Sequence, residues 1–456
     1  MLHIFYNASA QWTTVGAPNF ANGGGDYVFS AVAPNGEPYV VYREYSHYAK
    51  AAVKKFDGSN WVTVGNAGFS LDAVFCTTMA IDGNNIPYVA YSDSTRKASV
   101  MKFDGSSWVY VGNCGFTSGA GSYTSIAIDG NGIPYVAFRD FFHNYRASVM
   151  KFDGNNWVYV GSPGFSAFGS GQAGAVYTSL AIDKNGTPYV AYTELSNNLN
   201  VTVMKFDGSN WVYVGGAAGF STGGANNPSI VIDSNGVPYV GYEDNGNGSK
   251  ATVKKFDGSN WVPVGVSGFS PGVAEYTSLA IDNNNKLYLA FEDYANNKRA
   301  SVMSFDGNNW STVGTAGFSD SVAQYTTIAI DKNKGILYVA YEDLYDGTTN
   351  YPKYNATVMK FETTTAGINE TKNNSSLTVY PNPSDGVFQV NYFSSEKSKL
   401  QLNIVDAKGK IVFAETISQS QGEFKKDIDL GRKAKGIYFI ELLQGNSRLE
   451  QKFVLQ

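Results

Sequence analysis

A motif of about 50 residues occurs seven times along this chain and leaves few folds open to it. Every tryptophan occupies the same place in the motif, and consecutive tryptophans lie 47 to 54 residues apart. These tryptophans are Trp12, Trp61, Trp108, Trp157, Trp211, Trp261 and Trp310. The fullest copies read FDGSNWVYVG, then GFS, then YTSLAIDxNGxPYVAYxD and finally ASVMKFDG. Repetition at this period is typical of solenoids and propellers, in which each copy is one structural unit.

Each copy of the motif contains four short runs with the alternating pattern of a β-strand. In the second copy these runs are 76–81, 87–91, 99–103 and 108–112. The turns between them are Asp-x-Asn-Gly and Phe-Asp-Gly-Ser-Asn, in which Asn and Gly tolerate a positive φ. Four antiparallel strands repeated seven times predict an all-β fold, a seven-bladed β-propeller. A solenoid is the weaker alternative, because it needs polar capping repeats at both ends and the sequence contains none.

The last copy of the motif lacks its outermost strand. It supplies three strands, at 326–331, 337–341 and 357–361, and then the pattern stops. A suitable fourth strand lies at the other end of the chain, at 12–16. We therefore expect this N-terminal strand to complete the last blade and to close a ring of seven blades.

The composition is that of a turn-rich β protein, with 16 % charged residues, 14 % aromatic residues and 49 glycines. The net charge of −5 argues against nucleic acid or an anionic membrane as the main partner. No run of 18 apolar residues occurs, so we predict no transmembrane segment. Cys76 and Cys114 are too few for a metal cluster or a disulfide scaffold, and we predict neither a metal nor a cofactor. Cys76 opens an inner strand and Cys114 follows an outer strand of the same blade, so we expect the two to lie too far apart to bond.

The chain divides into four segments. Residues 1–10 end in Ala-Ser-Ala, a pattern that signal peptidase cuts, and we interpret them as the tail of a truncated signal peptide. An ordinary N-terminal strand is the alternative interpretation. Residues 11–361 form the predicted propeller, and the polar stretch 362–376 is a linker. Residues 377–456 have strands separated by new turn motifs, which is typical of a small β-sandwich.

The C-terminal segment carries a series of recognisable motifs. They are Tyr380-Pro-Asn-Pro383 with Gly386, Asp406-Ala-Lys-Gly409, Gly436-Ile-Tyr438 and the terminal Lys452-Phe-Val-Leu455. In this order they resemble the C-terminal sorting domain of type IX secretion substrates from Bacteroidetes. The resemblance implies an immunoglobulin-like β-sandwich that the type IX secretion machinery recognises. The residues that carry the sorting motif are then Pro381, Asn382, Pro383, Gly386, Gly436, Tyr438 and Lys452.

This resemblance also implies a route and a location for the chain. In the family the sorting domain is usually removed, and the passenger is often attached to surface lipopolysaccharide. We therefore expect an extracellular protein that is secreted or attached to the outer-membrane surface. The repeats resemble uncharacterised propeller repeats of such secreted proteins. They lack the Gly-Gly doublet of kelch repeats and the Trp-Asp pair of WD40 repeats, and they are only loosely similar to the Asp-box of sialidases.

The seven tryptophans have two interpretations. They could stack on sugar rings, or they could pack as wedges between neighbouring blades. Because a tryptophan occurs in every copy, we favour packing, since a repeat needs the same packing residue at every equivalent place.

A carboxylate recurs two residues after the PYVAY run of each copy. These rim carboxylates are Glu44, Asp93, Asp140, Glu194, Asp244, Asp293 and Asp343. The strand order places all of them on one rim of the propeller, together with the GFS loops. They could form a site for a cation or a polar ligand, or each could cap backbone N–H groups of its own loop. A second acidic column, which includes Asp82 and Asp129, lies in the Asp-x-Asn-Gly turns, where Asp is a turn former.

Two copies depart from the repeat in the same way. Each has an arginine before the rim carboxylate and a histidine four residues after that arginine, among aromatic residues. We therefore predict a ligand site for an acidic sugar or a peptide carboxylate. Its candidate residues are Arg43, Glu44, His47, Arg139, Asp140 and His143. The alternative is that each arginine simply pairs with its neighbouring acid.

The sequence gives little support for catalysis, because no nucleophile and base with an orienting partner can be picked out. We therefore predict a non-catalytic binding module for a glycan or a surface partner, exported through its C-terminal domain. A hydrolase that acts on polysaccharide with two rim carboxylates is one alternative. A passive adhesion or surface scaffold is the other.

Overall fold

The computed structural model of this chain describes residues 11–21, 24–167, 174–345, 353–362, 377–394, 399–406, 410–418, 422–444 and 447–456. The chain divides into two compact units, Met1–Thr363 and Thr364–Gln456. The predicted signal-peptide tail, 1–10, lies outside the described residues, as does the predicted linker apart from its first residue.

The first unit consists of seven four-stranded antiparallel sheets, which are the blades of a propeller. The innermost strands are β2 (Gly25–Val32), β6 (Phe75–Ile81), β10 (Gly121–Ile128), β14 (Ala175–Ile182), β18 (Ala225–Ile232), β22 (Ala274–Ile281) and β26 (Ala323–Asp331). The second strands are β3 (Pro38–Glu44), β7 (Pro87–Ser92), β11 (Pro134–Asp140), β15 (Pro188–Glu194), β19 (Pro238–Asp244), β23 (Leu287–Asp293) and β27 (Ile336–Tyr345). The third strands are β4 (Lys50–Phe56), β8 (Ala98–Phe103), β12 (Arg146–Phe152), β16 (Asn200–Phe206), β20 (Lys250–Phe256), β24 (Arg299–Phe305) and β28 (Lys353–Glu362). The outermost strands are β5 (Trp61–Thr63), β9 (Trp108–Tyr110), β13 (Trp157–Tyr159), β17 (Trp211–Tyr213), β21 (Trp261–Pro263), β25 (Trp310–Thr312) and β1 (Thr13–Thr14).

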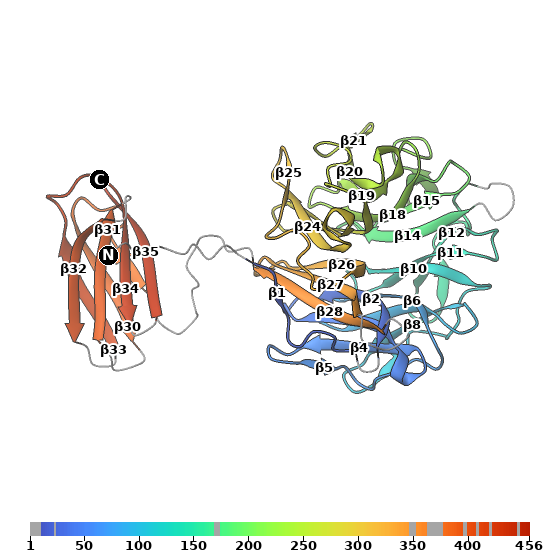
Figure 1. Cartoon of the computed structure of the whole chain (residues 1–456), viewed down its shortest axis with the longest axis horizontal. Coiled ribbons are helices and arrows are strands. Elements are labelled where there is room, and N and C mark those ends of the chain that lie inside the picture. The colour runs from blue at the N-terminus through green and yellow to red at the C-terminus, as the bar shows by residue number, and fades with distance from the viewer. Residues whose placement is uncertain are drawn as a thin grey trace. The chain divides into compact units, whose positions relative to one another are not determined.

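The innermost strands form a closed ring. Each contacts the next one along the chain, and β26 of the last blade contacts β2 of the first. In Figure 1 the colour runs from blue through green to orange as the chain passes from blade to blade around this ring. Among the described residues the helical elements are the 3-10 turns η1 (Tyr45–His47), η2 (Asn245–Asn247) and η3 (Tyr294–Asn296). The predicted seven-bladed propeller is therefore confirmed.

The last blade is closed by the N-terminal strand, as predicted. Its strand order is β1-β28-β27-β26, and β1 pairs antiparallel with β28. Thr13 lies opposite Lys360, and Thr14 lies opposite Met359. Because β1 covers the outer edge of β28, the last blade gains its fourth strand without a further repeat.

The tryptophans pack between neighbouring blades. Trp108 stacks on Phe69 with ring centroids 4.1 Å apart, and its indole N–H donates to the carbonyl of Val64 in the preceding blade at 2.8 Å. All seven tryptophans make the equivalent stacking contact and the equivalent hydrogen bond. This confirms that the tryptophans are packing wedges, which bury a large apolar area at each blade interface.

The two faces of the propeller differ. On the rim face the innermost strands begin and the second strands end, so that Gly25 lies opposite Glu44. The opposite face, the turn face, carries the Asp-x-Asn-Gly turns. There the Asp129 carboxylate accepts hydrogen bonds from the N–H groups of Asn131 and Ile133, both at 2.9 Å. This is the turn-forming role predicted for the second acidic column.

The second unit contains two antiparallel sheets that enclose one apolar core. Their strand orders are β29-β30-β33 and β32-β31-β34-β35. The strands are β29 (Leu377–Tyr380), β30 (Val387–Ser394), β31 (Lys399–Asp406), β32 (Ile411–Ser418), β33 (Gly422–Asp429), β34 (Gly436–Gln444) and β35 (Ser447–Leu455). Phe388 from the first sheet and Leu402, Ile440 and Phe453 from the second lie in this core. The unit is the predicted small immunoglobulin-like β-sandwich.

Candidate functional site

The rim carboxylates lie on the rim face, at the ends of the second strands, but they point into the blades. Six of them are at most 5 % exposed, and only Asp93 is half-buried. The Asp293 carboxylate accepts hydrogen bonds from the Ser301 hydroxyl at 2.7 Å and from the Ala295 N–H at 3.0 Å. Ser301 in turn accepts from the N–H of Gly317 in the GFS loop at 2.8 Å.

The same arrangement recurs around the ring. Asp140, Asp244 and Asp343 bind the hydroxyls of Ser148, Thr252 and Thr357. These carboxylates therefore tie each third strand and its loop to the second strand, which supports the capping interpretation. Their role as ligand contacts stays a prediction, which their burial does not favour.

Arg43 pairs with Asp26 on the neighbouring strand. Its Nε donates to Asp26 Oδ1 at 2.6 Å, and its Nη2 contacts the other carboxylate oxygen. The guanidinium also lies over the rings of Tyr27, Tyr45 and Phe75, at 4.7, 5.4 and 5.4 Å from the centroids. Although burial acts to lower the pKa of Arg43, the Asp26 carboxylate holds that pKa above its usual value. Asp26 thus fixes the Arg43 guanidinium against a group of aromatic rings. The ion-pair partner of Arg43 is Asp26 and not Glu44, the neighbouring acid in the sequence.

Arg139 occupies the equivalent position in the third blade, but its surroundings differ. Its cross-strand residue is Ser122, where the first blade has Asp26. The guanidinium lies over Phe141 and Tyr145, at 5.5 and 4.9 Å from the ring centroids. Burial lowers the pKa of Arg139. We call Arg43, Arg96 and Arg139 the arginine sector; Arg96 lies 4.3 Å over Phe75.

The two candidate histidines have matching partners. His47 Nδ1 lies 2.8 Å from Glu44 Oε2, and His143 Nδ1 lies 2.7 Å from Asp140 Oδ2. Their side chains are 47 % and 27 % exposed, whereas both carboxylates are 1 % exposed. The structure therefore pairs Glu44 with His47 and Asp140 with His143. Arg43 instead pairs with Asp26 on the neighbouring strand. The role of these histidines in ligand binding stays a prediction.

A ring of seven residues on the rim face, five of them tyrosines, was not predicted from the sequence. Each innermost strand contains a β-bulge, whose first residue has a positive φ between 47° and 54°. We call these residues the inner ring: Tyr27, Cys76, Tyr123, Tyr177, Asn227, Tyr276 and Tyr325. Ring centroids are 4.5 Å apart for Tyr276 and Tyr325, 5.8 Å for Tyr27 and Tyr325, and 5.0 Å for Tyr123 and Tyr177.

The bulge does not depend on tyrosine. The threonine after the bulge donates its hydroxyl to the inner-ring carbonyl of the preceding blade, as Thr124 does to Cys76 at 2.7 Å and Thr277 to Asn227 at 2.7 Å. The same bulge therefore forms with Cys or Asn. A tyrosine therefore stands at positive φ in five blades although the bulge itself does not require one. The signal in the sequence was the Tyr that opens YTSLAI in most copies.

Acidic residues lie beside the inner ring in the last three blades. We call Glu243, Glu275, Glu292 and Glu342 the acidic sector. Burial, followed by the charge of Glu275, raises the pKa of Glu292 to about 7. Burial, followed by the charge of Asp26, raises the pKa of Glu342 to about 8. On the rim face the arginine sector therefore lies in the first three blades and the acidic sector in the last three.

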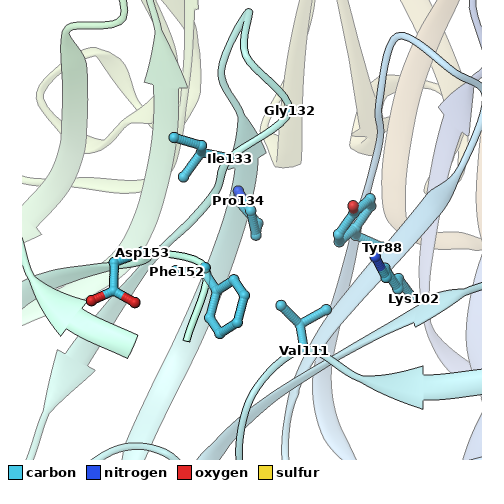
Figure 2. Close-up of a pocket in the computed structure, with 9 residues that line it drawn as sticks. Tyr88, Lys102, Val111, Gly132, Ile133, Pro134, Phe152 and Asp153 are labelled. Carbon is cyan, nitrogen blue, oxygen red and sulfur yellow. The ribbon is translucent and has the colours of Figure 1, made fainter. Parts of the chain in front are cut away.

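The turn face holds a shallow groove between the second and third blades, with a volume of about 270 Å³. Figure 2 shows Tyr88, Lys102 and Val111 of one blade and Pro134 and Phe152 of the next around it. Most of these side chains belong to the repeat itself. Within the described residues, no group of three or more His, Cys, Asp or Glu is arranged to hold a metal ion.

In the second unit, contacts within the fold hold several of the predicted motif residues in place. The Asn382 side chain donates to the carbonyl of Lys452 at 3.1 Å and accepts from the N–H of Val454 at 3.0 Å. At Gly386, φ is 137° and a Cβ would lie 2.7 Å from the Gly431 backbone, so only glycine fits. The Tyr438 hydroxyl donates to the carbonyl of Ala434 at 2.5 Å.

Comparison with known families identifies this unit. Residues 378–456 match the family model described as the secretion system C-terminal sorting domain. The C-terminal unit belongs to this sorting-domain family. This confirms the resemblance found in the sequence. The chain is therefore an exported protein, secreted or attached to the outer-membrane surface, and the secretion machinery is its partner. No helix in the described ranges has the length and apolar character to cross a membrane.

The propeller is similar to several solved structures at low sequence identity. An ulvan lyase of a new polysaccharide lyase family, bound to -[GlcA(1-4)Rha3S]-, is 13 % identical with a TM-score of 0.49, over 76 % of this chain and 95 % of that one. The Aleuria aurantia lectin with Fucα1-6GlcNAc is 15 % identical with a TM-score of 0.44, over 66 % and 98 %. A protein of unknown function from Dyadobacter fermentans is 12 % identical with a TM-score of 0.43, over 78 % and 98 %. The ligands in these names belong to those proteins. A search of curated proteins finds no significantly similar sequence.

Proposed function

We propose that the propeller is a carbohydrate-binding module whose binding surface is the inner ring on the rim face. The repeated tyrosine at the bulge of the innermost strands carries this proposal. The flat apolar face of a tyrosine packs against the C–H groups of a sugar, and its hydroxyl adds a hydrogen bond. Export of the chain supports the proposal, because an exported module meets glycans outside the cell.

Charged groups beside the inner ring supply selectivity. Guanidinium groups that lie over aromatic rings suit the carboxylate or sulfate of an acidic sugar. Arg43 and Arg139 both lie over aromatic rings and are the candidates for this contact. The proposed site therefore keeps Arg43 and Arg139 from the sequence prediction. It is centred on the inner ring and not on the rim carboxylates.

We also propose that the module is non-catalytic. The alternative of a polysaccharide hydrolase relied on rim carboxylates, and six of these are buried and at most 5 % exposed. A carboxylate that is buried inside its blade and turned toward its own strands is poorly placed to reach a substrate as a general acid or base. The passive-scaffold alternative predicts no saturable binding of any soluble glycan.

A glycan array probed with the full-length chain, with and without Ca²⁺, tests the proposal. Titration of the tightest glycan would then compare Tyr276→Ala and Tyr325→Ala with the wild type. We expect each change to weaken binding by about 3- to 10-fold, since one aromatic contact is removed. Tyr380→Ala in the sorting domain is the matched control, because that tyrosine is 76 % exposed and distant in sequence from the inner ring.

Two results would count against the proposal. If no glycan on the array binds saturably, the proposal is overturned and the passive scaffold is favoured. Release of shorter oligosaccharides from a bound polysaccharide would overturn its non-catalytic part.

A further inference from the structure

The acidic sector holds more buried carboxyl groups than the fold requires. The residue directly before each rim carboxylate lies next to the following blade. In the second blade this residue is Ser92, which donates to the carbonyl of Gly121 at 2.5 Å. In the fourth blade it is Thr193, which donates to the carbonyl of Ala225 at 3.0 Å. The last three blades have Glu243, Glu292 and Glu342 at this position. Because a small hydroxyl makes the contact between blades elsewhere, this contact by itself does not require a glutamate.

Glu292 is the clearest case. The residue is fully buried, and within the described residues neither of its carboxyl oxygens has a hydrogen-bond partner. Glu275 lies directly opposite it on the neighbouring strand and accepts a hydrogen bond from the Tyr294 hydroxyl at 2.8 Å. The nearest cation is the Lys298 ammonium, 4.0 Å from Glu292 Oε1, on a side chain that is 45 % exposed. The partly exposed Lys298 side chain thus brings an ammonium group to Glu292 from the solvent side of the rim face.

Tyrosine rings lie close to these carboxyl groups, since the Tyr294 hydroxyl donates to Glu275 at 2.8 Å. Burial, followed by the charges of Tyr325, Glu292 and Glu275, raises the pKa of the Tyr276 hydroxyl. Tyr276 and Tyr325 have centroids 4.5 Å apart. Carboxylates combined with the faces of tyrosine rings are the groups that bind an ammonium ion in proteins. Lys298 provides an internal precedent, because its ammonium lies 4.5 Å from the centroid of the Tyr294 ring.

We propose that the acidic sector binds a primary ammonium group, so that the glycan taken by the rim face contains amino sugars. This inference rests on the proposed carbohydrate-binding function and names the ligand class. Glu292 and Glu342 are the anionic contacts, and Tyr276 and Tyr325 form the aromatic wall between them.

Ammonium binding should be linked to the release of protons. Glu292 faces Glu275, Lys298 and Tyr276, and its pKa of about 7 leaves it partly protonated near neutral pH. Glu342 faces Asp26, Arg43 and Tyr325, and its pKa of about 8 leaves it mostly protonated there. An arriving ammonium favours the ionised carboxylates, and the displaced protons pass to the solvent.

The experiment compares a β-1,4-linked glucosamine oligomer with its N-acetylated counterpart of the same length. Isothermal titration with the full-length chain at about pH 6.5, in buffers of different ionisation enthalpy, measures affinity and proton release together. We expect the amine form to bind about tenfold more tightly and to release protons. Glu292→Gln and Glu342→Gln should each remove most of this difference, because one charge–charge interaction is lost.

The variants need a control for folding. Glutamine is close in shape to the neutral form of these glutamates, and the melting temperature of each variant checks the fold. Glu37→Gln is the matched control, because Glu37 lies near the turn face beside Lys55 and its loss should change neither affinity.

The outcomes separate this inference from the proposed function. Equal binding of both oligomers would overturn the ammonium site and leave the carbohydrate module standing. If neither oligomer nor any other glycan binds, both proposals fall. Binding of polylysine without binding of the glucosamine oligomer would overturn the amino-sugar assignment in favour of a protein partner. Competitive displacement of the amine oligomer by Ca²⁺ would overturn the ammonium assignment in favour of a metal ion.

Discussion

Trp12 donates its indole N–H to the carbonyl oxygen of Val313, 301 residues further along the chain, at 2.8 Å. Its ring also stacks on Phe318 with centroids 4.0 Å apart. These are the contacts that every other tryptophan makes with the preceding blade. The N-terminal strand is therefore held in the last blade by the same tryptophan contacts that join the other neighbouring blades.

Replacing Trp12 by alanine should destabilise the propeller more than any change on its exposed neighbours. The side chain is 8 % exposed, and the change removes a buried indole and its hydrogen bond, a loss of about 3–5 kcal/mol. Urea unfolding followed by circular dichroism measures the loss. Thr13→Ala, at an exposed position on the same strand, is the control and should stay within about 0.5 kcal/mol of the wild type. Equal stability of the two variants would contradict this account of ring closure.

Removing Arg43 should destabilise the fold because it leaves Asp26 without its cationic partner, with only the Tyr45 hydroxyl still donating to it at 2.7 Å. Asp26 is 9 % exposed, and an uncompensated carboxylate at such a site costs about 2 kcal/mol. We therefore expect Arg43→Ala to lower stability and the double variant Asp26→Ala/Arg43→Ala to recover part of the loss. Equal losses for the single and the double variant would show that packing of the arginine, and not the ion pair, matters.

The buried rim carboxylates should matter for stability rather than for glycan affinity. Asp293→Ala removes hydrogen bonds from Ser301, Ala295 and Asn296, and we expect a loss of about 2–3 kcal/mol. Asp93→Ala is the matched change at the half-buried member of the same column and should cost less. Thermal unfolding compares the two. A loss of glycan binding in a fully folded Asp293→Ala protein would instead make this carboxylate a ligand contact.

The acidic sector should make the chain less stable as the pH rises through the neutral range. The pKa values of Glu292 and Glu342 are raised to about 7 and about 8 from the usual 4.5, so the folded chain holds protons that the unfolded chain releases. Their stabilising contribution is complete below about pH 4.5 and is lost as the pH rises through 7 and 8. Melting temperatures of Glu292→Gln and Glu342→Gln should therefore depend less on pH and exceed the wild type at alkaline pH.

Glu37→Gln provides a control in which the pH dependence of stability should change in the opposite direction. Although burial acts to raise the pKa of Glu37, hydrogen bonds from Asn35 and Lys55 hold that pKa below its usual value. The glutamate therefore contributes stability above its unfolded pKa, and this contribution is lost as the pH falls. A Glu37→Gln protein that behaves like Glu292→Gln would contradict the assigned directions.

Deleting 378–456 should stop export of the propeller at the periplasm of a type IX secreting host. The sorting domain is the part that the machinery recognises, and the propeller has its own core. Cell fractionation and surface labelling locate the product. Thr13→Ala in the full-length chain is the control and should still reach the surface, because Thr13 is exposed and its loss leaves the fold stable. Normal surface display of the truncated chain would contradict this role of the domain.

The repeat, the strand order and the closure of the ring could be predicted from the sequence. Strand and turn signals are local, and a sevenfold repeat presents each of them seven times, so the alignment of copies places the strands. The packing role of the tryptophans could be predicted for the same reason, because a residue that recurs in every copy is typically a packing residue. The sorting domain was identified from short motifs whose order is specific.

The surroundings of the candidate site were decided by the tertiary structure. The β-bulge in each innermost strand shifts the register and turns Tyr27 and its equivalents to a conformation that strand alternation does not predict. Arg43 meets Asp26 because the two strands pair in one register, although 17 residues separate them. The acidic sector exists only because Glu292 and Glu342, 50 residues apart in the chain, lie on adjacent blades of a closed ring. Strand periodicity depends on neighbouring residues in the chain, whereas burial, charge pairing and pKa depend on groups that only folding brings together.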